Sequence, residues 1–408
     1  MRSINMTPGS KTKLESPRVR FGTHILVRSK VVHLWLMLLV LVMKGQVALA
    51  DNHKPSSSPF ASVVLAHFNE WDLNHNGILE PDELDKLIAQ KGIHGDVAAA
   101  LGTLKTIQRG GKFEVPKLNQ NYFKKYAKSA RDKKLEGLPP FDSYYELAKQ
   151  RINNKSLVIF PPDQPSLSAV HQGTLGDCFV LAALSSMIVR DPSSVKQLIV
   201  REANGEYTVQ FPGSKKVRVA PLTDTELALT STTQGHGLWL NLFEKAYGQL
   251  RTELLDEEKQ TLCSTDAICK GGSAGIVIQD LTGHQVKCRN LQPTKKDSTS
   301  VEKRIEALHE LLTKSVSAKH LLCAGTLSEQ KAKSLPSHHA YSILGYDAKS
   351  RMVYLFNPHG NTFQPKGEPG LKNGYATKSG RFAMPLADFV ECYRTVFYET
   401  DQLRSDSK

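Results

Sequence analysis

The sequence has few cysteines, no internal repeat of fixed period and no apolar run of membrane-spanning length. Six cysteines occur in 408 residues without a C-x-x-C pair, so a cysteine-based metal site has little support. The formal net charge is +13, but residues 1–50 carry +7 of it and the rest of the chain only +6. No basic cluster alternates with aromatic residues, which argues against a nucleic-acid partner.

The most apolar run, Val31–Met43, has only thirteen residues, whereas a membrane span needs about 20. It follows a basic stretch ending at Lys30 and precedes small residues at Ala48 and Ala50. This pattern is typical of a secretory signal peptide. We therefore expect a secreted or exported protein; the alternative is membrane attachment through an uncleaved signal anchor. Export would also permit a Cys263–Cys269 disulfide, although spacing alone cannot establish connectivity.

The segment DLNHNGILEPDE matches the twelve-residue calcium loop of an EF-hand. Apolar residues at helical spacing on both sides predict two flanking helices. Oxygen donors at alternating positions suit a hard cation, so Ca²⁺ is the expected cofactor, with modest affinity because two ligands are neutral. The predicted ligands are Asp72, Asn74, Asn76, the carbonyl of Ile78, Glu80 and Glu83.

A second segment, Thr106–Lys117, has the shape of such a loop without its ligands. Gly111 occupies the turn position and Phe113 the apolar position, but positions 1, 3, 5 and 12 lack carboxylates. We expect a degenerate partner hand that covers the apolar face of the first one.

The segment HQGTLGDCFVLAALSSM, His171–Met187, places Cys178 before an apolar helix. A helix N-terminus favours a thiolate through its dipole and free N–H groups. The side-chain amide of Gln172 can donate to an oxyanion beside the Cys178 N–H group. A buried structural cysteine remains the alternative for this segment taken alone.

A thiolate nucleophile needs a base, and the base needs an orienting group. His339 precedes an alternating run that predicts a strand, and a second strand over Met352–Gly360 contains Asn357. A hairpin between the two strands would bring His339 and Asn357 together. We expect His338 and His359 to be surface residues.

These segments resemble those of the calpain family of cysteine proteases. QGTLGDCFVLAAL, HAYSILGY and FNPHG are similar to its cysteine, histidine and asparagine segments. Gly237–Leu250 and Gly271–Gly283 resemble two further family segments. The match covers about 161–400.

The resemblance implies a papain-like, two-lobed α+β core. It implies Cys178 as nucleophile, His339 as general base and acid, Asn357 as orienting residue and Gln172 as oxyanion donor. The chain differs from the family pattern at Phe179 and His359, where a tryptophan is usual. The expected organisation is 1–50 signal peptide or anchor, 51–59 linker, 60–128 EF-hand pair, 129–160 connecting helix, 161–275 and 276–400 protease lobes, and 401–408 tail.

The expected function is calcium-dependent hydrolysis of protein or peptide substrates through an acyl-thioester on Cys178. Two alternatives remain: a catalytically silent calcium-responsive binding protein, and an acyl transferase that uses transglutaminase-like chemistry.

Overall fold

A computed structural model describes residues 58–110, 114–162, 165–257, 260, 263–293 and 299–404. The run Val31–Met43 lies outside these residues. None of the described helices combines the length and apolar character needed to cross a membrane. The possible Cys263–Cys269 disulfide is not formed in this structure, in which the Cys263 thiol lies 3.3 Å from the Thr265 hydroxyl.

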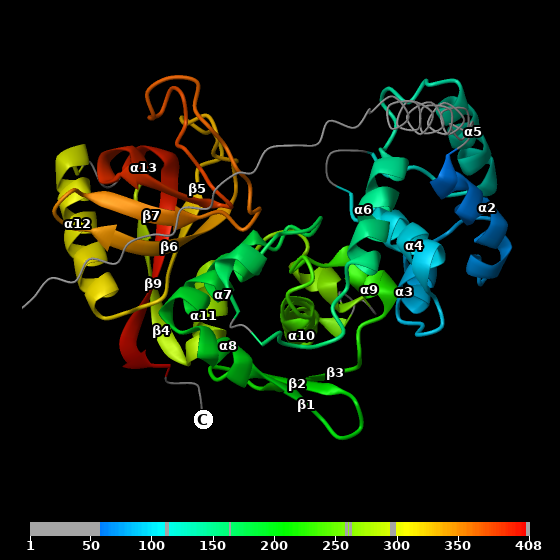
Figure 1. Ribbon diagram of the computed structural model, residues 1–408, viewed down its shortest axis with the longest axis horizontal. Coiled ribbons are helices and arrows are strands. Elements are labelled where there is room, and N and C mark those ends of the chain that lie inside the picture. The colour runs from blue at the N-terminus through cyan, green and yellow to red at the C-terminus, as the bar shows by residue number, and fades with distance from the viewer. Residues whose placement is uncertain are drawn as a thin grey trace, which may run out of the picture. The chain divides into compact units, whose positions relative to one another are not determined.

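Five helices form the first described part of the chain. Ser58 and Asn119 cap two of these helices by accepting hydrogen bonds from backbone N–H groups. Aromatic residues dominate the core: the Phe60 and Phe141 rings stack with centroids 4.8 Å apart. Residues 129–160, the segment expected to connect two domains, therefore contain a helix that is buried in this core. The helices are α2 (Pro59–Trp71), α3 (Pro81–Ile88), α4 (Gly95–Gln108), α5 (Gln120–Arg131) and α6 (Phe141–Asn153) (Figure 1).

The loop between α2 and α3 pairs with the loop between α4 and α5. The Leu79 N–H donates to the Leu118 carbonyl at 2.9 Å. The second loop therefore does not have the predicted register, in which Phe113 is the apolar position of Thr106–Lys117. Helix α4 continues into that segment until Gly110, at φ 75°, ends it, so the second loop begins later. Phe113 itself lies outside the described residues.

The first of the two predicted lobes packs helices against a three-stranded antiparallel sheet. The predicted helix that starts at the cysteine is confirmed as α7. Its residues from Phe179 to Ile188 are buried in the lobe core. The elements are α7 (Cys178–Arg190), α8 (Pro192–Leu198), β1 (Ile199–Arg201), β2 (Tyr207–Gln210), β3 (Lys216–Val219), α9 (Asp224–Leu229), α10 (Trp239–Thr252) and α11 (Ala274–Thr282), with 3-10 turns η1 (Leu167–Ala169) and η3 (Ser264–Ile268).

The second lobe is a six-stranded antiparallel sheet with strand order β4-β9-β5-β6-β7-β8. The predicted hairpin is confirmed, since β6 pairs with β7 and Ser342 lies opposite Phe356. Helices α12 and α13 pack against the sheet. The elements are β4 (His284–Asn290), α12 (Val301–Ser317), β5 (Leu322–Thr326), β6 (Ala340–Asp347), β7 (Met352–Phe356), β8 (Arg381–Pro385), α13 (Leu386–Cys392) and β9 (Tyr393–Leu403) (Figure 1).

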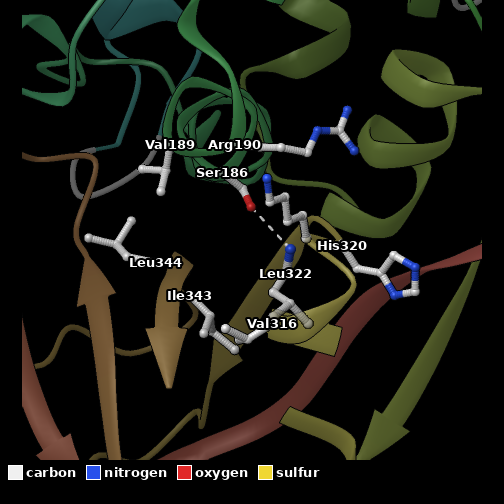
Figure 2. A pocket seen from close by; sticks show the side chains of 9 residues that line it. Ser186, Val189, Arg190, Val316, His320, Leu322, Ile343 and Leu344 are labelled. Atoms are coloured by element: carbon white, nitrogen blue, oxygen red, sulfur yellow. Dashed lines mark hydrogen bonds between the residues drawn. The ribbon is translucent and has the colours of Figure 1, made fainter. Parts of the chain in front are cut away.

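Helix α7 joins the two lobes. The Ser342 hydroxyl in β6 donates to the Ala182 carbonyl at 2.7 Å, and the Leu322 N–H donates to the Ser186 hydroxyl at 3.0 Å. Figure 2 shows the Ser186 contact beside a cavity of about 190 Å³ between α7, β5, β6 and the end of α12. The helix that carries the cysteine is thus bonded to the sheet that carries the histidine. The α+β fold predicted for the protease part is confirmed.

Candidate active site

Cys178 is the first residue of α7, and tight backbone packing fixes its position. The Gly176 N–H donates to the Cys269 carbonyl at 2.9 Å. A Cβ atom at Gly176 would lie 2.4 Å from that carbonyl oxygen, so only glycine fits. Burial raises the pKa of the Cys178 thiol, while the backbone N–H groups of Ala340, Phe179 and Cys178 itself lower it.

His339 stands directly before β6, and its ring is oriented by Asn357 at the end of β7. The His339 Nε2 atom lies 2.8 Å from Asn357 Oδ1. The His359 backbone N–H also donates to this oxygen, which identifies it as an acceptor. His339 therefore carries its hydrogen on Nε2, and Nδ1 keeps a lone pair that can accept a proton.

The His339 side chain is almost completely shielded from solvent, with 6% of its surface exposed. The exposed His359 ring stacks on it with centroids 4.3 Å apart and 17° between the planes. His359 thus covers the His339 ring from the position where the family usually has tryptophan. Burial lowers the pKa of His339 to about 3, helped by His359 and opposed by the hydrogen bond with Asn357. The imidazole is neutral at physiological pH.

Cys178 and His339 line the same cavity, of about 350 Å³. Its other walls come from the Gly271–Gly272 segment, β5 and β9. A Cβ at Gly272 would lie 2.6 Å from the Phe179 ring, so a side chain there would displace Phe179 from the wall. The cavity joins residues from both lobes, which is the arrangement that an extended substrate between the lobes requires.

Gln172 lies in the loop that leads into α7. Its backbone N–H donates to the Pro358 carbonyl at 2.8 Å, which connects this loop to the segment after Asn357. Its side-chain Nε2 donates to the Leu175 carbonyl, also at 2.8 Å. Gln172 is not among the described residues that line the cavity. Its amide retains a second N–H group for an oxyanion.

Two buried acids beside the nucleophile were not predicted from the sequence. Asp177 and Glu244 are both fully buried, and Arg151 of α6 lies close enough to interact with them. One indication of this pair is present in the sequence. Glu244 lies among apolar residues of α10, where burial of a charge costs free energy.

In the loop Asp72–Glu83, the carboxylates at the two ends accept hydrogen bonds from backbone N–H groups of the loop. Asp72 Oδ1 and Oδ2 accept from the backbone N–H groups of Asn76 and Gly77 at 3.0 and 2.8 Å. Glu83 Oε1 and Oε2 accept from Asn74 and Glu80 at 3.1 and 2.8 Å. Asp72 and Glu83 are buried, and two adjacent carboxylates with amide and carbonyl oxygens fit the donor set that calcium prefers.

A second cluster of acidic side chains does not need a metal ion. Asp85, Cys263 and Asp266 offer ligand atoms within 4.8 Å of one another. The Lys105 ammonium pairs with both carboxylates, and Arg109 pairs with Asp266 at 2.7 Å. The negative charge is already balanced, so this group joins α3 and α4 to η3.

Comparison with known proteins agrees with this geometry. The family model described as calpain family cysteine protease matches residues 146–397. Calpain-8 of Homo sapiens is 24% identical over 252 residues, which are 54% of this chain and 33% of that protein. A calpain of Schistosoma mansoni is 24% identical over 298 residues, 65% of this chain and 38% of that protein. Calpain-1 catalytic subunit of Sus scrofa is 27% identical over 218 residues, 49% of this chain and 28% of that protein.

The two-lobed fold and the cysteine–histidine cavity define a papain-like cysteine protease domain. The chain belongs to the calpain family of cysteine proteases. It spans about a third of the length of the curated relatives that it matches.

Proposed function

We propose that the protein is a cysteine endopeptidase that hydrolyses protein substrates through an acyl-thioester on Cys178. The observation that carries this proposal is the His339–Asn357 hydrogen bond in the wall of the cavity that Cys178 also lines. It leaves Nδ1 of a neutral imidazole as the proton acceptor.

The reaction follows from these groups. His339 Nδ1 takes the thiol proton while Sγ attacks the scissile carbonyl carbon. The C–N bond then breaks, and His339 gives the proton to the leaving amine. A water molecule, deprotonated by the same nitrogen, hydrolyses the thioester and restores the thiol. The Cys178 backbone N–H and the Gln172 side chain would stabilise the oxyanion of both tetrahedral intermediates.

The proposal also includes Ca²⁺ at Asp72–Glu83, held by the loop residues described above. The ion would neutralise the two buried carboxylates and so stabilise the helix pair α2–α3. We favour a structural role over a sensor role, because the paired second loop supplies no acidic ligand set and one ion gives no cooperativity between sites.

Replacement of the thiol tests the proposal. We expect Cys178→Ser to lose peptidase activity while keeping its unfolding transition, because the change is nearly isosteric and a hydroxyl is a much poorer nucleophile. A fluorogenic peptide assay and thermal denaturation measure both effects. Full activity in a pure Cys178→Ser preparation would remove this residue from the reaction.

Two other functions give different results. Acyl transfer would produce peptide–amine conjugates when a primary amine is added, and mass spectrometry detects them. A silent binding protein would resist labelling of Cys178 by a thiol-directed peptide epoxide.

A further inference from the structure

The carboxyl group directly before the nucleophile is not used as a helix cap. Asp177 occupies the N-cap position of α7, where aspartate normally accepts hydrogen bonds from the first turn. Its side chain accepts none there, although it is fully buried. No N–H or O–H group of another described residue donates to either of its oxygens. The carboxyl group therefore does not cap the helix that it precedes.

The partner of this carboxyl group is Glu244 in α10, itself fully buried and within hydrogen-bonding reach. Both Glu244 oxygens face the Ser231 backbone N–H, at 3.2 and 3.0 Å. Repulsion between two buried carboxylates in contact strongly favours a state in which one of them holds a proton. Glu244 accepts from the Ser231 backbone N–H, which favours its ionised form, whereas Asp177 has only its own backbone N–H as a donor.

One cation balances the pair. Arg151 of α6 interacts with both acids, and its guanidinium donates to the Ala228 carbonyl at 2.8 Å. The titratable or charged groups that face Asp177 among the described residues are Glu244 from α10, Arg151 from α6 and Cys178 from α7. Burial, followed by Glu244, raises the pKa of Asp177 well above its ordinary value.

We propose that Asp177 is a positioning residue that stays protonated, donates to Glu244 and thereby keeps both negative charge and a capping acceptor away from the start of α7. This role rests on the proposed function of Cys178 as nucleophile. An ionised Asp177 would compete for the N–H groups of the first turn, which the thiolate and the oxyanion use. It would also place a negative charge beside the thiolate and raise the thiol pKa.

Two isosteric variants, each of which replaces one carboxyl group of the pair by an amide, show which residue donates the hydrogen bond between Asp177 and Glu244. In Asp177→Asn the amide donates to Glu244, as the protonated acid does. In Glu244→Gln the amide becomes the donor, so Asp177 ionises beside Cys178. We expect Asp177→Asn to keep kcat/KM within about threefold of wild type, and Glu244→Gln to lose about ten- to a hundredfold. The pH midpoint for alkylation of Cys178 by iodoacetamide should rise by about one unit in Glu244→Gln only.

The shared proton has two readouts that do not depend on peptidase activity. Infrared spectra at neutral pH should contain the carbonyl band of a protonated carboxyl group in wild type, and Asp177→Asn should lack it. The unfolded chain releases this proton above the ordinary aspartate pKa of 3.8, whereas the folded protein retains it. The folding equilibrium constant of wild type should therefore fall with rising pH relative to Asp177→Asn, by up to about tenfold per pH unit.

The proposal is overturned if the band is the same in wild type and Asp177→Asn, or if the two isosteric variants alkylate Cys178 with the same pH midpoint. Asp177→Ala, which removes the donor, should lose activity that Asp177→Asn retains. If wild type hydrolyses no peptide, the proposed function fails, but the infrared band and the alkylation midpoints still test the carboxyl pair.

Discussion

Three neighbours restrain the His339 side chain and backbone. Asn357 accepts from the ring, Thr326 accepts from the His339 backbone N–H at 2.9 Å, and His359 stacks on the ring face. These contacts place the ring in one tautomer and one orientation. The same enclosure removes water, which explains why the ring is neutral.

The first prediction at this scale concerns the separate roles of His339 and Asn357. We expect His339→Ala to lower kcat by about 10²–10⁴-fold, because the proton acceptor is lost. Asn357→Ala should retain measurable activity, since Asn357 only orients the His339 ring. Steady-state peptide hydrolysis by both variants measures the difference. Wild-type rates for His339→Ala would contradict the assignment.

The second prediction follows from the pKa of His339, which burial lowers to about 3 from 6.5. Below pH 6.5 the unfolded chain binds a proton that the folded protein does not. Stability should therefore fall with falling pH, by up to about 1.4 kcal/mol per unit, until the folded pKa is reached. Urea unfolding between pH 6.5 and 4 should show this loss, and His339→Gln should lack this contribution. Equal slopes for both proteins would show that His339 titrates normally.

At the scale of elements, ion pairs join helices α3 and α4 to the turn η3. Lys105 is 3% exposed and lies between Asp85 and Asp266. Arg109 adds a second pair with Asp266. The Gly176–Cys269 hydrogen bond then connects the residue that follows η3 to the loop before α7. Elements distant in sequence are thus connected through a few polar groups.

Removal of the central cation tests this junction. We expect Lys105→Met to lower the free energy of unfolding by about 3–5 kcal/mol, because it leaves the buried Asp85 carboxylate without its ion-pair partner and removes one of the two cations that pair with Asp266. The matched control is Lys149→Met, whose surface pair with Asp96 at 3.4 Å should contribute less than about 1 kcal/mol. Urea denaturation of both variants gives the comparison. Similar losses of unfolding free energy in the two variants would mean that burial of Lys105 does not increase the contribution of its ion pairs to stability.

At the scale of the whole molecule, a hydrogen bond and an ion pair join the N-terminal part of the chain to the first lobe. The Thr223 hydroxyl donates to the Ile88 carbonyl at 2.8 Å, and Lys155 pairs with Asp224 at 2.7 Å. These contacts are independent of any ion. They use none of the predicted calcium ligands.

The prediction at this scale is that Glu83→Ala weakens calcium binding and lowers the melting temperature in calcium buffer. Glu83 would supply two of the oxygens that hold the ion. The calcium concentration at half-maximal peptidase activity should change little. Calorimetry and a calcium titration of activity make the two measurements. A large increase in that concentration with unchanged melting would show that the loop is the sensor.

Local pattern in the sequence was enough to predict the elements that carry the candidate catalytic residues. The apolar run after Cys178 defines α7, and alternation around His339 and Asn357 defines the β6–β7 hairpin. Each of these two predictions uses side chains within one helix or one hairpin. The spacing of the apolar side chains there shows which face is buried. The fold class followed, because these segments occur in the order of a known family.

Long-range packing decided the rest. Leu118 pairs with Leu79, because the pairing depends on where α4 ends and how two loops meet. Asp177 and Glu244 lie 67 positions apart in the sequence, and nothing local indicates that their carboxyl groups meet. Burial and neighbouring charge set their protonation and that of His339, and both exist only once the chain has folded.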